Sequence, residues 1–198
     1  MGTKGDKTKK KICEEAYKLF SERGYKDITM KDICDKTGLS RGGLYRHYES
    51  TEQIFLEIVN SFAERQKNEF EDKIKQRIPA TTILDEILSR YANEMTDSQN
   101  SLSLAIYEYY SDPKVSKTEN SVVKQYEISK SMWIQLINYG MKNKEFRNVN
   151  SEAVFDLIVF SYQGVRMYSR LMKIDMSIPN RIISEIKRLL LREEVYHG

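Results

Sequence analysis

Residues 29–55 read TMKDICDKTGLSRGGLYRHYESTEQIF, and this stretch predicts two short helices joined by a turn and followed by a third helix. Thr29 and Asp32 have the Thr-x-x-Asp spacing in which two side chains satisfy the free amides at a helix N-terminus. Gly38 can adopt the left-handed conformation that ends a helix at little cost. Ser40 then predicts the N-cap of a second, very short helix.

The second short helix contains two adjacent glycines, Gly42 and Gly43, although a glycine in a helix interior costs about 0.8–1 kcal/mol relative to alanine. So short a helix must be held by packing, which we expect from Leu39, Leu44 and Tyr48. The glycines would let the backbone approach the floor of a DNA major groove, which admits an α-helix. The alternative is that the two glycines only mark a loop.

The side chains around the glycines favour the DNA-binding interpretation. Arg41, Tyr45, Arg46 and His47 lie on the same expected surface, and all four can donate hydrogen bonds to phosphate oxygens. Arg41 can also donate two hydrogen bonds to a guanine base. We therefore expect this helix to present its first residues to base edges in the major groove.

This pattern, which runs from Thr29 through Thr37–Ser40 to Leu44–Tyr48, resembles the DNA-binding domain of TetR-family transcriptional regulators. The motif match covers roughly the first 60 residues, and the chain length and an all-helical remainder agree with the family. The resemblance implies a homodimeric repressor that binds a palindromic DNA operator. It also implies that the second half of the chain binds a small-molecule inducer.

The resemblance further implies phosphate contacts, because the family uses a threonine, a tyrosine, a histidine and a lysine for them. Thr29, Tyr45 and His47 match three of these positions, whereas Thr51 stands where the lysine is usual. Hydroxyl groups and free amides at that helix N-terminus would hold the phosphate instead. The residues that we expect at the DNA are Thr29, Ser40, Arg41, Gly42, Gly43, Tyr45, Arg46, His47 and Thr51.

The charge distribution agrees with a polyanionic partner near the N-terminus. The chain has 198 residues and a net charge of +3. Residues 1–50 contain 12 Lys or Arg and 8 Asp or Glu, whereas the remainder contains 20 against 21. Positive charge is thus concentrated where the DNA-binding motif lies. A run of lysines in the first residues either follows the DNA backbone or forms a solvated tail: Lys4, Lys7, Lys9, Lys10 and Lys11.

Composition excludes several other classes of protein. Cys13 and Cys34 are the only cysteines and suggest no disulfide framework. The first residues contain no apolar signal region, so we expect a cytoplasmic protein. The longest apolar stretch, 153–168, is interrupted by Asp156, Gln163 and Arg166, and it is therefore a poor membrane span.

The chain contains few prolines and glycines, and apolar residues recur at helical spacing, so we expect an all-α protein of about nine helices. We assign residues 1–50 to a DNA-binding helix-turn-helix domain and residues 51–198 to a helical ligand-binding and dimerisation domain. After the three helices of the first domain, we expect helices at 50–77, 81–95, 101–110, 115–143 and 151–172, and a last helix from Ser177.

Aromatic side chains are frequent on the expected inward faces of the second half. Each one singly is more often plain core, but a buried tyrosine hydroxyl needs a hydrogen-bond partner, so several together favour a ligand pocket. A planar cation near Glu94 or Glu108 is one hypothesis for the ligand. The expected pocket residues are Tyr91, Tyr107, Tyr110, Tyr126, Trp133, Phe155 and Tyr162.

The expected helix 151–172 is apolar on nearly all sides, which requires cover from more than one neighbour. The resemblance implies that this helix and the last one pair with their copies about a two-fold axis. Ser161 and Gly164 are small enough for a close approach of helices there. The expected dimer residues are Ser161, Gly164, Tyr168, Ile182, Ile186 and Leu190.

No catalytic signature stands out, and we predict neither an enzyme nor a cofactor or metal site. Glu194 and His197 have the spacing of half a di-iron site, but the chain has two histidines in all and lacks the second motif. Two other interpretations stay open. One is a DNA-binding architectural or cell-cycle factor whose second half binds a protein, and the other is a helical enzyme or carrier that only mimics the motif.

Overall fold

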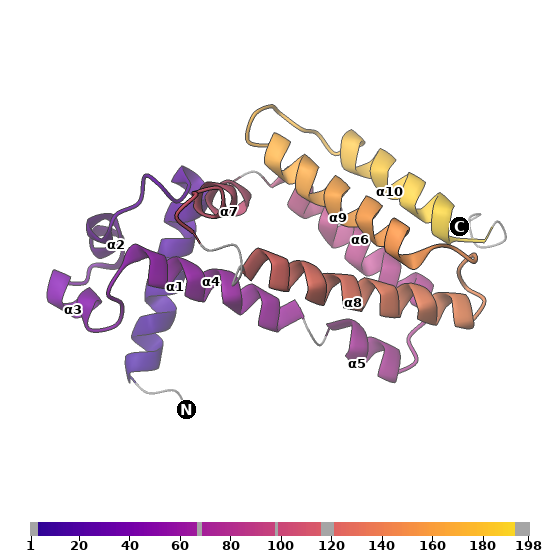
Figure 1. Ribbon diagram of the computed structural model, residues 1–198, viewed down its shortest axis with the longest axis horizontal. Coiled ribbons are helices and arrows are strands. Elements are labelled where there is room, and N and C mark those ends of the chain that lie inside the picture. Colours follow the sequence, from indigo (N-terminus) through magenta and orange to yellow (C-terminus); the bar gives the residue numbers. More distant parts are fainter. Residues whose placement is uncertain (1–3, 67–68, 98, 116–120, 193–198) are drawn as a thin grey trace. The chain divides into compact units, whose positions relative to one another are not determined.

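The computed structural model describes residues 4–66, 69–97, 99–115 and 121–192. These ranges contain ten helices and no strand, which confirms the predicted all-α class (Figure 1). In chain order the helices are α1 (Lys4–Arg23), α2 (Met30–Thr37), α3 (Arg41–Tyr45), α4 (Thr51–Gln66), α5 (Glu69–Lys75), α6 (Ala80–Thr96), α7 (Ser103–Tyr110), α8 (Ser121–Lys142), α9 (Ser151–Tyr168) and α10 (Ser177–Leu190).

The tenth helix lies within the range 50–77, where we predict one helix and the described residues carry both α4 and α5. α4 ends at Gln66 and α5 begins at Glu69, while residues 67–68 lie outside the described part of the chain. The helix predicted at 151–172 was also too long, because α9 ends at Tyr168.

One compact unit of the chain comprises Met1–Ala63 and Gln99–Ser121. Within it, α1 packs against α2 and α7, and α2 packs against α3. Its core contains a cluster of rings, in which Phe55 lies 5.1 Å from Phe20 and 5.2 Å from Tyr109, centroid to centroid. We call this compact unit the N-terminal unit. The functional division predicted after residue 50 stays a prediction, and the unit that contains residues 1–50 also includes the first part of α4 and all of α7.

The turn after α1 is attached to α7 by a carboxylate. Gly24 has a φ of +82°, and a Cβ atom built on it would lie 2.5 Å from Oε2 of Glu108. That oxygen accepts hydrogen bonds from the backbone N–H groups of Tyr25, at 2.7 Å, and of Lys26, at 3.1 Å. The left-handed backbone therefore favours glycine at position 24, and a larger residue would also have to displace the carboxylate of Glu108.

The other compact unit, the C-terminal unit, comprises Glu64–Ser98 and Val122–Gly198. In it α6, α9 and α10 pack against one another, and α5 packs against α6. Trp133 is 1% exposed at the centre of its core, with the ring of Phe70 at 5.5 Å in an edge-to-face arrangement. No helix within the described ranges is long and apolar enough to cross a bilayer.

Candidate nucleic-acid interface

The N-terminus of α2 has the capping box that the Thr-x-x-Asp spacing predicts. The backbone N–H of Asp32 donates to Oγ1 of Thr29 at 3.3 Å, and the backbone N–H of Thr29 donates to Oδ2 of Asp32 at 2.9 Å. Arg23 adds an ion pair of 3.0 Å to the same carboxylate. The hydrogen bonds from Thr29, and then the guanidinium of Arg23, hold the pKa of Asp32 far below its ordinary value of 3.8.

The turn between α2 and α3 also follows the prediction. Gly38 has a φ of 71°, and its N–H donates to the carbonyl of Cys34 at 2.9 Å. Ser40 caps α3, because its Oγ accepts a hydrogen bond of 3.1 Å from the N–H of Gly43. Leu44 is fully buried, so packing of this side chain holds a helix of only five residues against the unit.

The outer surface of α3 is open. Arg41, Gly42 and Arg46 are exposed, and the side chain of Tyr45 is 43% exposed. A Cβ atom built on Gly42 would meet nothing within 4 Å. The fold of the protein therefore gives no reason for glycine at position 42, and the bare backbone faces outward.

The residues after α3 lead directly into α4. His47 is half-buried, and its N–H donates to the carbonyl of Leu44 at 2.9 Å. Ser50 accepts a hydrogen bond of 3.2 Å from the N–H of Gln53 and so caps α4, which begins at Thr51. Thr51 is half-buried at this helix N-terminus, where amide groups are available to an anion.

The N-terminal lysines belong to a helix, because α1 begins at Lys4. Nζ of Lys11 donates to the carbonyl of Thr37 at 2.8 Å, and Lys9 lies over the ring of Tyr48, 5.2 Å from its centroid. These lysines are therefore part of a helix and not a tail, but Lys7, Lys9, Lys10 and Lys11 are all exposed. Whether they follow a DNA backbone stays a prediction.

The α2–α3 motif lies in a segment that matches a known protein family. Residues 12–58 match the model of a family described as bacterial regulatory proteins, tetR family. The chain is 25% identical over 149 residues to YfiR of Bacillus subtilis, named an uncharacterized HTH-type transcriptional regulator, and this match covers 75% of the chain and 72% of that protein. It is 24% identical over 156 residues to the HTH-type transcriptional repressor KstR2 of Rhodococcus jostii, with 78% and 74% covered.

The fold agrees over almost the whole chain. A crystal structure of a TetR transcription regulator from Haloarcula marismortui superimposes with a TM-score of 0.74 at 21% identity, covering 94% of this chain and all of that one. Residues 12–58 belong to the DNA-binding domain of the TetR family. The protein is therefore a DNA-binding transcriptional regulator, and the matched residues include the α2–α3 pair described above.

The aromatic residues predicted to line one pocket of this regulator fall into both compact units. Tyr107 and Tyr110 lie on α7 in the N-terminal unit, and Tyr107 is 61% exposed. The other five lie in the C-terminal unit, where the rings of Tyr91 and Tyr162 are stacked at 4.2 Å. Trp133 and Phe155 are fully buried core residues.

Two of the predicted dimer residues of the regulator do not face outward. Ile186 and Leu190 are buried inside the protomer, because the face of α10 that carries them packs against α6 and α9. Ile182 is half-buried against the same core. Ser161 is half-buried, Gly164 has open space around it, and Tyr168 is 59% exposed on α9.

The sequence analysis missed two outward-facing apolar residues of α9. Leu157 is 53% exposed and Phe160 is 64% exposed. Their signal was the apolar character of this helix on nearly all sides, but periodicity alone does not show which side the protomer covers. With Tyr168, they form an exposed apolar stripe along α9, which we call the α9 stripe.

The sequence analysis also missed Arg166, which contacts the predicted pocket residue Tyr162. The hydroxyl of Tyr162 donates a short hydrogen bond to Glu94 and accepts one of 2.6 Å from Arg166. The side-chain Nε of Arg166 is buried without a hydrogen-bond partner among the described residues. Burial is the main reason that the pKa of Tyr162 is raised above its ordinary value of 10.0.

Proposed function

We propose that the protein is a homodimeric repressor that binds a palindromic operator and is released from it by a small molecule. The open surface of α3 supports this function most directly, because Arg41 and Arg46 flank a backbone that no side chain covers at Gly42. A helix of this kind can enter a major groove and approach base edges closely.

In the proposed complex, Arg41, Gly42, Gly43 and Arg46 lie near the bases, and Arg41 donates two hydrogen bonds to a guanine. The remaining predicted residues position the DNA backbone: Thr29, Ser40, Tyr45, His47 and Thr51. Two half-sites on one face of the duplex are then about 34–36 Å apart, or a multiple of that distance. Because the protein acts on genomic DNA, we infer a cytoplasmic location.

The dimer that we propose pairs the α9 stripe of one protomer with the same stripe of its copy. Leu157, Phe160 and Tyr168 expose apolar surface along one helix, and Gly164 between them permits a close approach. A two-fold pairing uses the same patch on both protomers, so a single apolar helix face can provide both halves of the interface.

The inducer of the proposed repressor binds in the C-terminal unit beside the cluster of Tyr91, Tyr162, Glu94 and Arg166. Stacked rings offer a flat apolar surface, and the buried Nε of Arg166 can donate to a polar group of the ligand. The inducer lowers DNA affinity by favouring a conformer that binds DNA weakly. The size of this effect is limited by how much more tightly the inducer binds that conformer than the DNA-binding conformer.

The experiment starts from the duplexes that the purified protein selects from genomic fragments, with and without a metabolite extract. Fluorescence anisotropy then compares the wild type with Arg41→Ala, His47→Ala and a control, Lys142→Ala, an exposed residue of the C-terminal unit. Arg41→Ala should cost roughly 1–3 kcal/mol at one base pair and relax the preference there. His47→Ala should weaken binding to all sequences alike.

The absence of affinity for any duplex at low salt would refute the proposal. An inducer that binds equally well to the free protein and to the operator complex would refute the coupling, since linkage between two ligands is reciprocal.

A further inference from the structure

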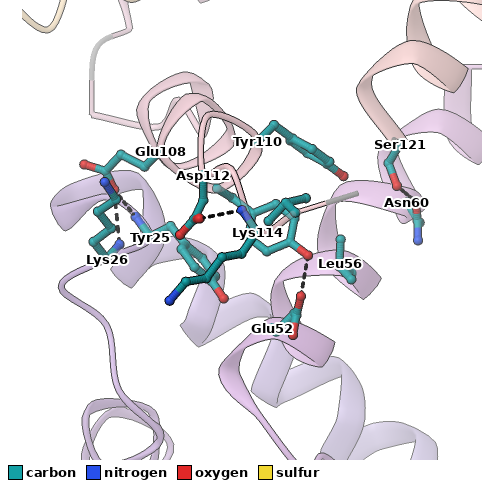
Figure 2. Close-up of a pocket in the computed structure, with 12 residues that line it drawn as sticks. Tyr25, Lys26, Glu52, Leu56, Asn60, Glu108, Tyr110, Asp112, Lys114 and Ser121 are labelled. Atoms are coloured by element: carbon teal, nitrogen blue, oxygen red, sulfur yellow. Dashed lines mark hydrogen bonds between the residues drawn. The ribbon is translucent and has the colours of Figure 1, made fainter. Parts of the chain in front are cut away.

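The N-terminal unit contains a cleft of ≈ 630 Å³ between the turn after α1, the first part of α4, α7 and the residues that follow α7 (Figure 2). Its lining includes Tyr25, Glu52, Leu56 and Tyr110. The volume lies in the range of about 300–1,000 Å³ that small-molecule sites occupy. The cleft is part of the unit that reads DNA and is separate from the C-terminal cluster around Tyr162.

Tyr110 gives this cleft a polar group that the protein leaves unused. Its hydroxyl oxygen is buried, and it has no hydrogen-bond partner among the described residues. Buried hydroxyls are usually paired, so an unpaired one is unusual, and here it belongs to a residue that lines the cleft. Figure 2 shows Tyr110 in the wall of the same cleft as Glu52.

Carboxylates dominate the charged groups of the cleft. Glu52, Glu108 and Asp112 line it together with two lysines, Lys26 and Lys114. In each carboxylate one oxygen is engaged by the protein: Glu52 accepts from the hydroxyl of Tyr109 at 2.5 Å, Glu108 from two backbone N–H groups, and Asp112 from the N–H of Lys114 at 2.9 Å. Among the residues that the structure describes, none donates a hydrogen bond to the other oxygen of these three carboxylates, so that oxygen can accept one from a ligand.

Burial and nearby carboxylates both act on the tyrosines of the cleft. Burial, and then the charge of Glu52, raises the pKa of Tyr25 above its ordinary value of 10.0. Burial and the hydrogen bond to Glu52 raise the pKa of Tyr109 in the same direction. Burial disfavours any ion, so the part of this shift that favours a cation is the negative charge of Glu52 and, for Tyr25, of Asp112.

We propose that this cleft binds a small aromatic amine, whose ring lies against Tyr25 and Leu56 and whose ammonium group donates to Glu52. The ammonium group also donates to the hydroxyl oxygen of Tyr110, which is buried in this structure and is reached when the side chain of Tyr110 turns toward the ligand. Aromatic rings and carboxylates are the groups that hold organic cations in proteins. The occupancy of the cleft is independent of DNA. Glu52 directly follows Thr51, a predicted phosphate contact, so a ligand at Glu52 could change DNA binding. That effect on DNA binding rests on the proposed function.

The test uses three indole probes of matched shape and different charge: tryptamine, the neutral tryptophol and the anionic indole-3-propionate. Binding to the full chain is measured by ligand-observed NMR and by calorimetry without DNA. The variants are Glu52→Gln, Tyr110→Phe and the control Glu14→Gln, which changes an exposed carboxylate of α1. Glu52→Gln and Tyr110→Phe should each weaken tryptamine binding by roughly fivefold to tenfold, while Glu14→Gln leaves it unchanged.

Tyr110→Phe keeps the ring and removes a hydroxyl that has no partner, so its melting temperature should not fall, and this separates a lost ligand contact from a lost fold. The proposal is overturned if tryptamine does not bind at millimolar concentration, if the three probes bind equally, or if Glu52→Gln leaves its affinity unchanged. DNA affinity is measured separately on the selected duplexes. A protein that binds tryptamine at this cleft but no duplex would contradict the proposed function and leave the cleft proposal standing.

Discussion

The hydroxyl of Tyr109 donates a hydrogen bond of 2.5 Å to Oε1 of Glu52, and this contact ties α7 to the first turn of α4. The two residues are far apart in the sequence, yet they lie directly beside the N-terminus at which Thr51 is predicted to meet a phosphate. The ring of Tyr109 also packs on Phe55 and on Tyr25, at 5.2 and 4.9 Å between centroids. The orientation of α4 thus depends on α7.

Tyr109→Phe keeps the ring packing and removes the hydrogen bond, so we expect a loss of about 1 kcal/mol in the free energy of unfolding. Because α4 loses its link to α7, we also expect weaker binding to the operator. Chemical denaturation and anisotropy measure the two effects, with Tyr107→Phe as the control, since Tyr107 is exposed on the same helix. An unchanged stability would show that the contact contributes nothing in solution.

Gly42→Ala should stabilise the protein while weakening its binding to DNA. Alanine is better than glycine in a helix by up to about 1 kcal/mol, and the added methyl group meets no atom of the protein. The same methyl group would hold the backbone of α3 away from the bases. Ser89→Ala, on the exposed side of α6, should raise stability without changing DNA affinity. If Gly42→Ala bound DNA as tightly as the wild type, the glycine would have no role in groove entry.

Asp32→Asn should destabilise the protein near neutral pH by about 1 kcal/mol, since the carboxylate completes the cap of α2. The pKa of Asp32 is lowered by folding, so the unfolded chain binds more protons below the ordinary value of 3.8, and stability falls as the pH drops through that region.

The difference between wild type and Asp32→Asn should therefore shrink in acid, which urea unfolding at a series of pH values measures. Asp35→Asn, an exposed carboxylate on the same helix, serves as the control. A difference that is constant with pH would mean that the ionised carboxylate is not the stabilising form.

Gly140→Ala should lower the free energy of unfolding by about 1–3 kcal/mol, because a close-packed core has no room for the added group. A Cβ atom at position 140 would lie 2.3 Å from Cδ2 of Phe146, a fully buried ring. Lys142→Ala, an exposed neighbour on α8, should change the stability little. Wild-type stability of Gly140→Ala would show that the ring of Phe146 can move away at no cost.

Phe160→Glu should convert the proposed dimer into monomers, because it places a charge in the middle of the α9 stripe. Light scattering and sedimentation measure the mass, and circular dichroism shows whether the helices persist. Lys142→Glu adds the same residue to an exposed site of the C-terminal unit outside the α9 stripe and should remain dimeric. A dimer that survives Phe160→Glu would place the interface elsewhere.

The sequence by itself determined the reading element. The caps at Thr29 and Ser40 and the left-handed Gly38 depend on hydrogen bonds between residues three or four positions apart, so each appears in the sequence as a short motif. The exposure of Arg41 and Tyr45 followed from the same spacing, because a helix held by Leu44 must turn its other side outward.

Only the tertiary structure decided which apolar residues were left outside. Ile186 and Leu190 look like Leu157 and Phe160 in the sequence, and the difference is that α6 and α9 cover one pair and nothing in the protomer covers the other. The cleft beside Tyr110 depends in the same way on α1, α4 and α7 meeting in one unit. Helical periodicity indicates that one face of a helix is apolar. Which other helix covers that face depends on contacts between residues that are distant in the chain.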